Sequence, residues 1–229
     1  GGGVGGGGGF FAGARLLGQR LTSKFGRANL VENMAGAGGN IAAGYVAKAA
    51  PDGCTLLMTG NNHTINPMIY PKAGYAMKDF APVIQTVEGT SVLVVNAQQP
   101  FKNIAELIQY AKANPGKLAY SSSGIGLPNH VAMALFLKAA KIDIVHVPYK
   151  GSAPALNDTI AGVVPVSITS SAAALPFIKA GKIRALIVSA PKRWPTLPDV
   201  PTVAEAGYPE ASNVTWLGIL APAGTPAAT

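Results

Sequence analysis

The sequence predicts an α/β fold with largely parallel sheets, and three observations support this prediction. Short apolar runs that read as strands alternate with helix-like segments along most of the 229 residues, an order typical of parallel sheets. Hydrophobic residues make up 48% of the chain and charged residues 12%, which is ample material for a core. The 28 glycines and 18 prolines indicate many short connections between elements.

The first part of the chain opens with "GGGVGGGGGF", which reads either as a flexible linker or as a stretch whose side-chain identities are unassigned. A helix is expected over residues 12–25, where Leu17, Leu21 and Phe25 recur every fourth position. The strand "NLVEN", a helix over residues 40–50, a Pro-Asp-Gly turn and the buried strand "CTLLMTG" follow. The segment "NNHTINPMIY" reads as a polar loop, and we expect both chain ends to be incomplete.

The middle of the chain contains two strand-like runs, "APVIQTV" and "SVLVVNA", and then the clearest helix of the sequence. This helix is expected to begin after Asn103, because Asn is a good N-cap and Glu106 stands where a capping box needs an acidic residue. Its apolar face is expected to consist of Ile104, Leu107, Ile108 and Ala111.

The second half of the chain continues the alternation of strands and helices. Strands are expected at residues 117–123, 143–149, 164–170, 183–190 and 214–222. Helices are expected at residues 128–141, 153–161 and 172–180, with a short one at 202–207 after a proline-rich loop.

Two segments that lie between α/β blocks are candidates for the places where the chain passes from one lobe to the other. They are found around residues 92–102 and 217–222. If both are crossings, residues 1–97 and 219–229 form a discontinuous first lobe, and residues 98–218 form an inserted second lobe.

The composition argues against several classes of protein. The net charge is +8, but the basic residues are scattered rather than gathered on a stripe, so no nucleic-acid partner is expected. A simpler interpretation of the positive net charge is a general electrostatic field that attracts small anions. Cys54 is the single cysteine, which leaves no intrachain disulfide and no cysteine-based zinc site. The three histidines show no metal-ligand spacing, and neither a metal nor a cofactor is expected.

Four loops rich in small polar residues follow predicted strands: "TGNNHTIN", "YSSSGIG", "PYKGSAPA" and "ITSSAAA". In open α/β sheets, ligands bind beyond the carboxyl ends of strands, where helix N-termini offer unpaired N–H groups to anions. Such loops also favour Ser, Asn and Gly for helix capping alone, and for any single loop capping is the commoner explanation. Four loops together favour a cleft that binds a carboxylate or a phosphate.

Enzymatic interpretations have weaker support. Gly124 and Gly126 are followed by Asn129 where a dinucleotide fingerprint needs a glycine, and "YSSSG" lacks the first glycine of a nucleophile elbow. A triad of Ser123, His130 and Asp158 is conceivable, but no spacing supports it. His146 alternates within a predicted strand and is expected to be structural.

Several motifs in fixed order resemble one family of proteins. "VENMAGAGGNIAAGYVAKAAPDGCTLLM", "YSSSGIGLPNHVAMALF", "VPYKGSAPALNDTIAG", "FIKAGKIRALIVSAPKRWPTLPDVPTVAEAG" and "WLGILAPAGTP" are similar to the substrate-binding proteins of tripartite tricarboxylate transporters, the Bug family of periplasmic receptors. The resemblance extends from Ala14 to Pro226.

The resemblance implies a two-lobed, type II periplasmic-binding-protein fold that closes like a Venus flytrap on a ligand between its lobes. It implies a periplasmic protein that has lost its signal peptide and delivers a small carboxylate, or a related aromatic acid or amide, to separate membrane permease subunits. No catalysis and no cofactor are implied. We expect a monomer.

The resemblance also implies site residues. In the family's first loop Gly8, Gly9, Ala14 and Arg15 fit the pattern, whereas Phe11 stands where an aspartate is usual. The expected ligand-binding residues are Phe11, Ala12, Asn61, His63, Ser122, Ser123, Gly124, His130, Tyr149, Lys150, Thr169 and Ser170.

Two other functions remain open at this point. One is an α/β enzyme that acts on a small carboxylate or a phosphate ester, and turnover of a bound ligand would distinguish it. The other is a sensor that presents the bound ligand to a partner protein. The sequence does not name the ligand.

Overall fold

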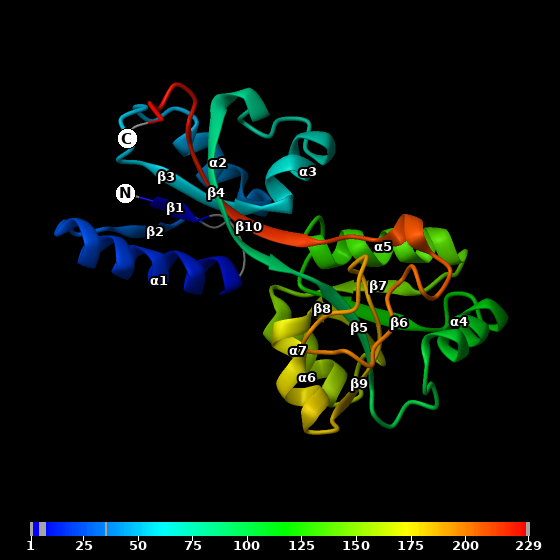
Figure 1. The fold of residues 1–229 in the computed structure, drawn as a ribbon. Helices are drawn as coiled ribbons and strands as arrows, with labels where there is room; N and C mark the ends of the chain where they lie inside the picture. Colours follow the sequence, from blue (N-terminus) through cyan, green and yellow to red (C-terminus); the bar gives the residue numbers. More distant parts are fainter. Residues whose placement is uncertain (1, 5–7, 35, 228–229) are drawn as a thin grey trace. The chain divides into compact units, whose positions relative to one another are not determined.

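The fold consists of two α/β units, each built around its own sheet (Figure 1). A computed structural model describes residues 2–4, 8–34 and 36–227, with the backbone alone for residues 2–4 and 8–12. Unit 1 comprises Gly1–Glu88 and Trp216–Thr229, and unit 2 comprises Gly89–Thr215. The predicted α/β class is therefore confirmed.

Unit 1 holds a five-stranded sheet in the order β2-β1-β3-β10-β4. Strands β1 and β3 run parallel, as do β1 and β2, whereas β10 is antiparallel to β3. The elements of unit 1 are β1 (Gly2–Val4), α1 (Gly8–Phe25), β2 (Val31–Asn33), η1 (Ala37–Gly39), α2 (Asn40–Val46), β3 (Leu56–Gly60), α3 (Asn61–Ile69), η2 (Met77–Asp79), β4 (Phe80–Gly89) and β10 (Thr215–Pro222).

The glycine-rich start is not a linker over its described residues. Gly2 pairs with Val31 on one side and Leu56 on the other, so residues 2–4 form a strand inside the sheet, and α1 begins at Gly8. This helix starts earlier than the predicted 12–25 because glycines carry no apolar periodicity from which a start can be read.

The segment "NNHTINPMIY" forms helix α3 and not the loop that its polarity predicted. Its inward face is made of amides: Asn62 and Asn66 are buried, and their Nδ2 atoms donate to the Gly38 carbonyl oxygen at 2.8 and 2.9 Å. Asn66 Nδ2 also lies 2.6 Å from Oδ1 of Asn40. A helix that buries hydrogen-bonded amides shows no apolar stripe, so the hydrophobic pattern could not indicate it.

Unit 2 holds a second five-stranded sheet in the order β7-β6-β8-β5-β9. Strand β6 runs parallel to both of its neighbours, β7 and β8, whereas β5 is antiparallel to both β8 and β9. Both sheets are thus mixed. The elements of unit 2 are β5 (Ser91–Asn96), α4 (Ile104–Ala113), β6 (Ala119–Ser122), α5 (Pro128–Ala140), β7 (Val145–Pro148), α6 (Ser152–Ile160), β8 (Val166–Ser170), α7 (Ser171–Lys179), β9 (Ile183–Val188) and η3 (Pro209–Ala211).

Strand β5 is the centre of the unit 2 core. All six of its residues are buried, with Leu93 and Val95 packed in one apolar cluster and Val92 and Val94 in another. The first cluster includes residues of α4, α5 and η3, and the second includes residues of α6 and α7. Because β5 pairs with β8 and β9, the division between units falls before this strand, whereas the expected boundary at residue 97 followed it.

Two helix predictions in unit 2 have opposite outcomes. Helix α4 is capped as expected: the Asn103 side chain accepts from the Glu106 N–H at 3.0 Å, and its predicted apolar face is buried. The helix predicted at residues 202–207 is a turn, although the Thr202 and Glu205 side chains each accept the backbone N–H of the other residue, as in a helix capping box. Gly207, with a φ of 92°, ends the segment before a regular helix can form.

Candidate functional site

The candidate site is the edge of the unit 2 sheet at which β6, β7 and β8 end. The parallel register brings Ser122 opposite Pro148, and each of the three strands leads into the N-terminus of a helix: α5, α6 or α7. Strand β5 begins at the same edge, because Ser91 pairs with Ser170. Three of the four predicted polar loops therefore meet at one edge of one sheet.

The loop after β6, residues 122–126, is held by side chains from three elements. The Ser122 hydroxyl is fully buried, lies 2.6 Å from Nε2 of His146 and accepts the Gly124 N–H at 3.2 Å. The Gly126 N–H donates to Nδ1 of His130 at 3.2 Å. Gly124 and Gly126 have φ values of 143° and 77°, which favour glycine at both positions.

Three stacked aromatic rings adjoin this loop. His146 stacks on Tyr120 with ring centroids 4.8 Å apart, and on His130 with centroids 4.4 Å apart. Burial lowers the pKa of His130, and burial followed by the charge of His130 lowers the pKa of His146. Both imidazoles are therefore neutral at pH 7.

The turn after β7 is bound to the 122–126 loop through its backbone. The Tyr149 N–H donates to the Ser122 carbonyl oxygen, and the Gly151 N–H donates to that of Ser123, both at 3.0 Å. The Tyr149 hydroxyl donates to Oδ2 of Asp158 at 2.6 Å, and this bond is the main reason that the pKa of Tyr149 is raised. Lys150 is exposed and supplies a positive charge at this edge.

At the end of β8, Thr169 and Ser170 differ in their surroundings. Thr169 is buried, and its Oγ1 makes no hydrogen bond within the described part of the chain. Ser170 is exposed, and its Oγ caps α7 by accepting the Ala173 N–H at 3.2 Å. A hydroxyl that is buried without a partner is costly, so Thr169 is a candidate to meet a ligand or a water molecule.

Asn129 joins the 122–126 loop to strand β8, although the sequence patterns do not single it out as a site residue. The Ser123 hydroxyl donates to its Oδ1 at 2.8 Å, and its Nδ2 donates to the Ile168 carbonyl oxygen at 3.3 Å. The triad of Ser123, His130 and Asp158 is not assembled, because each of these side chains bonds to a different group: Asn129, Gly126 and Tyr149 respectively.

A second polar group at this edge is also absent from the predicted site. Thr90 Oγ1 lies 3.2 Å from Ser189 Oγ, which donates to the Asn213 carbonyl oxygen at 2.9 Å. Each of these residues stands just before or just after a strand, and this position is the signal that could have identified them.

The predicted residues of unit 1 lie on helices. Asn61 begins α3, and its Oδ1 accepts the Trp216 N–H at 2.9 Å. His63 is buried, and neither of its ring nitrogens makes a hydrogen bond within the described residues. Burial lowers the pKa of His63 to about 4. Phe11 and Ala12 belong to α1, and their side chains lie outside the described part of the structure.

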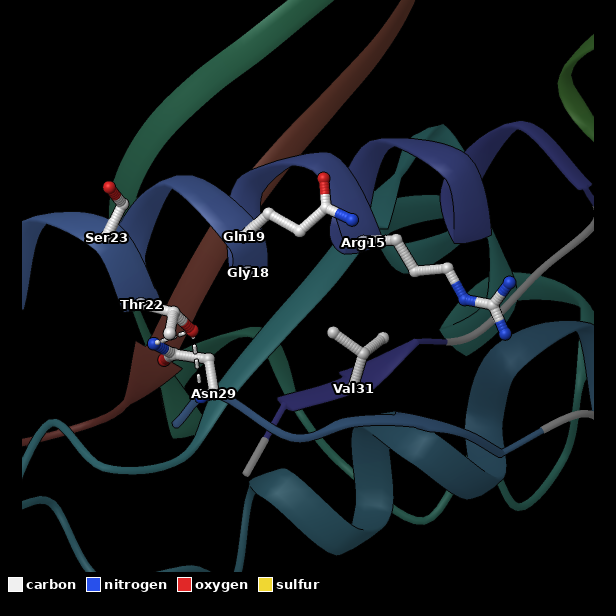
Figure 2. Close-up of a pocket in the computed structure, with 7 residues that line it drawn as sticks. All are labelled: Arg15, Gly18, Gln19, Thr22, Ser23, Asn29 and Val31. Atoms are coloured by element: carbon white, nitrogen blue, oxygen red, sulfur yellow. Dashed lines mark hydrogen bonds between the residues drawn. The ribbon is translucent and has the colours of Figure 1, made fainter. Parts of the chain in front are cut away.

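A pocket of about 550 Å³ lies elsewhere in unit 1, between α1 and β2. Figure 2 shows Arg15 and Gln19 of α1 on one side and Val31 of β2 on the other, with Asn29 bonded to Thr22. Its lining includes none of the predicted ligand residues. Among the described residues, no cluster of His, Cys, Asp and Glu is able to hold a metal ion, and no helix has the length and apolarity to cross a membrane.

Two α/β units with a polar sheet edge define the class of protein, which is the two-lobed solute-binding fold. The family follows from the sequence. The family described as "Tripartite tricarboxylate transporter family receptor" matches residues 14–229, and the chain belongs to it. The resemblance seen in the sequence motifs is thereby confirmed.

Comparisons with individual proteins agree with this family. The chain is 41% identical over 215 residues to a UPF0065 protein from the tcbD-tcbE intergenic region of Pseudomonas sp. strain P51, covering 93% of this chain and 64% of the relative. It is 38% identical to Rpa4515 of R. palustris, solved with adipate, with a TM-score of 0.88 over 99% of this chain and 78% of that one. MatC (Rpa3494) of Rhodopseudomonas palustris, solved with malate, is 33% identical with a TM-score of 0.84 over 98% and 78% of the two chains. The chain spans 64% to 66% of the length of three curated relatives.

Proposed function

We propose that this chain is the ligand-binding part of a periplasmic receptor that captures a small dicarboxylate and delivers it to membrane permease subunits. Membership of the receptor family supports the transport role. The ligands of two similar structures, adipate and malate, both carry two carboxylates and support the ligand class.

The observation that carries the proposal is the convergence of three helix N-termini at the polar edge of unit 2. Helices α5, α6 and α7 contain 13, 9 and 9 residues, and each follows a strand that ends at this edge. Helix N-termini present unpaired N–H groups and a partial positive charge, which favour a carboxylate. The exposed Lys150 and the net charge of +8 add to the attraction for an anion.

The proposed ligand contacts are the groups at this edge that retain donor capacity. They are Lys150, Thr169 and Ser170. The residues whose polar groups already bond within the protein are proposed to act mainly by shaping the loops, and they are Ser122, Ser123, Gly124, His130 and Tyr149. For unit 1, the family resemblance alone supports Asn61 as a ligand contact.

Isothermal titration calorimetry of the purified protein with adipate, malate, citrate and acetate tests the proposal. We expect saturable binding of at least one dicarboxylate, and weaker binding of acetate because it offers one carboxylate instead of two. The affinity is expected to fall as salt is raised, since screening weakens the attraction between the basic protein and the anion.

Absence of binding by every carboxylate would contradict the proposed ligand class. Chromatography of the ligand after prolonged incubation with the protein distinguishes a receptor from an enzyme. A receptor returns the ligand unchanged, whereas a new product would contradict the receptor role.

A further inference from the structure

The hydrogen bond between Gly126 and His130 determines which ring nitrogen of His130 carries the proton. A backbone N–H can only donate, so Nδ1 of His130, 3.2 Å from the Gly126 nitrogen, must be the acceptor. The single proton of the neutral ring is then on Nε2. Protonation of Nδ1 would place two donors against each other and break the bond.

The same reasoning applies to His146 through Ser122. The Ser122 hydroxyl already accepts the Gly124 N–H, and its side chain is fully buried, so its own hydrogen needs a nearby acceptor. Nε2 of His146, at 2.6 Å, supplies that acceptor when it is unprotonated. The neutral His146 therefore carries its proton on Nδ1, and protonation of Nε2 would leave the Ser122 hydrogen without a partner.

We propose that His130 and His146 are positioning residues for the ligand, because their unprotonated ring nitrogens hold the 122–126 loop in the conformation that receives it. Through these two acceptors the rings fix the directions of the Gly126 and Gly124 N–H groups. The inference rests on the proposed function only where the ligand is concerned, since the hold on the loop exists without one.

The surroundings of both rings oppose protonation. Tyr120 of β6 and His130 of α5 both stack on His146, and a charge on one imidazole disfavours a charge on its neighbour. Two charged groups lie near α6. Asp158 accepts a hydrogen bond from Tyr149, whereas Lys150 is exposed. Neither of them bonds to an imidazole among the described contacts. Because burial lowers the pKa of both histidines below the ordinary value of about 6.5, the hold on the loop is complete near neutral pH and is lost as the pH falls through these lowered pKa values.

Nitrogen-15 chemical shifts of the imidazoles at pH 7.5 provide the first test on the intact chain. We expect the proton on Nε2 in His130 and on Nδ1 in His146. The opposite tautomer in either ring would overturn the assignment of that ring as an acceptor for the loop.

Amide hydrogen exchange of the ligand-free protein provides the second test. Between pH 7.5 and 5, corrected for intrinsic exchange, protection of Gly124 and Gly126 is expected to fall by about fivefold or more, the equivalent of one lost hydrogen bond. Gly162, whose N–H bonds to the Thr159 carbonyl oxygen in the same unit, is the internal control and is expected to stay constant. Unchanged protection at Gly124 and Gly126 would overturn the proposal.

Paired variants separate an acceptor role from simple packing. His130→Asn and His146→Gln each keep an acceptor near the nitrogen that they replace but cannot be protonated in this range, so protection of the loop should no longer depend on pH. His130→Ala and His146→Ala should lower protection by about fivefold at all pH values. Should a variant fail to fold, the wild-type pH profile and the tautomers still decide the question.

Calorimetry with adipate then tests whether the conformation of the loop affects ligand affinity. We expect the wild-type affinity to fall between pH 7.5 and 5, and His130→Asn to remove the part of this dependence that comes from His130, while the part that comes from protonation of adipate stays in both proteins. An equal pH dependence of affinity in the two proteins alongside a loosened loop would overturn the positioning role. Failure of adipate, malate and citrate to bind would count against the proposed function, while the tautomer and exchange results would stand on their own.

Discussion

The hydroxyl of Tyr75 donates to the carbonyl oxygen of His63 at 2.8 Å, inside unit 1. In a regular α3 this oxygen would accept from the residue four positions later, but that residue is Pro67, which has no N–H. Tyr75 thus supplies from outside the helix the donor that the proline lacks. Burial is the main cause that raises the pKa of Tyr75 to about 12, so its hydroxyl remains a donor throughout the neutral range.

This relationship predicts that Tyr75→Phe lowers the free energy of unfolding by about 1–2 kcal/mol, because the His63 carbonyl loses its partner while the ring stacking is kept. Urea denaturation measures the change. In a Pro67→Ala background, the restored N–H of residue 67 satisfies the carbonyl, and Tyr75→Phe should cost clearly less. Equal costs in the two backgrounds would show that the hydroxyl does not replace the missing helical donor.

His63 predicts a dependence of stability on pH. Its folded pKa of about 4 lies below the unfolded value of about 6.5, so the unfolded state binds more protons between these values. The stability that the neutral ring contributes is complete above pH 6.5 and decreases as the pH falls towards 4, by about 3 kcal/mol in total.

Comparison with His63→Phe isolates this contribution, since phenylalanine keeps an aromatic ring beside Tyr75 and Phe80 but cannot be protonated. Any packing change shifts the variant by a constant amount, whereas the difference between the two proteins should change with pH below 6.5. Parallel stability curves for the two proteins from pH 7 to 4.5 would contradict the buried, neutral state of His63.

Much of unit 2 could be predicted from the sequence, because the apolar periodicity and the capping residues of each helix and strand lie within that segment itself. Asn103 and Glu106 mark the start of α4, and the serines after β6 and β8 mark strand ends that the parallel register then brings together. The position of β5 could not be predicted in this way. Its apolar run fits the interior of either sheet, and only its pairing with β8 and β9 assigns it to unit 2.

The roles of individual site residues are less accessible from the sequence than their place in the fold. The family resemblance predicts Ser122 as a ligand contact, yet its hydroxyl bonds to His146, a partner 24 residues away that the sequence does not connect to it. Likewise, helix α3 is stabilised by hydrogen bonds from Asn66 to Asn40 and Gly38, and such polar contacts produce no apolar periodicity in the sequence. Buried polar networks depend on tertiary contacts, and local patterns do not show them.

Gly124 predicts a second test of the 122–126 loop that involves no titration. Its φ is 143°, and a Cβ there would lie 3.4 Å from both Leu127 Cδ1 and the Tyr149 carbonyl oxygen. Gly124→Ala is therefore expected to lower both thermal stability and the affinity for adipate, the latter by about tenfold or more, because the loop must shift away from its present path.

Gly181→Ala is the matched control for this substitution. Gly181 also has a positive φ, 69°, but a Cβ at this position would meet no described atom within 4 Å. It stands between α7 and β9, away from the strand ends of the site. The substitution should cost about 1 kcal/mol of stability through backbone strain alone and leave the affinity for adipate unchanged. Equal losses of affinity in the two alanine variants would remove the argument for a specific loop conformation.

Thr169 and Thr159 together test whether the unpaired hydroxyl at the end of β8 serves a ligand. Both side chains are buried, but Thr159 Oγ1 donates to the Ala155 carbonyl oxygen at 3.0 Å and lies 3.1 Å from Ser121 Oγ, whereas Thr169 Oγ1 has no partner among the described residues. Thr159→Val should therefore lower the free energy of unfolding by about 1–2 kcal/mol and leave ligand binding intact, while Thr169→Val should leave stability unchanged or raised.

If the free hydroxyl of Thr169 meets a carboxylate, Thr169→Val should also weaken adipate binding by about tenfold, measured by calorimetry. A Thr169→Val protein that is as stable as the wild type and binds adipate equally well would show that this hydroxyl meets only water, and the ligand contacts would then have to be sought among the backbone N–H groups of the helix N-termini.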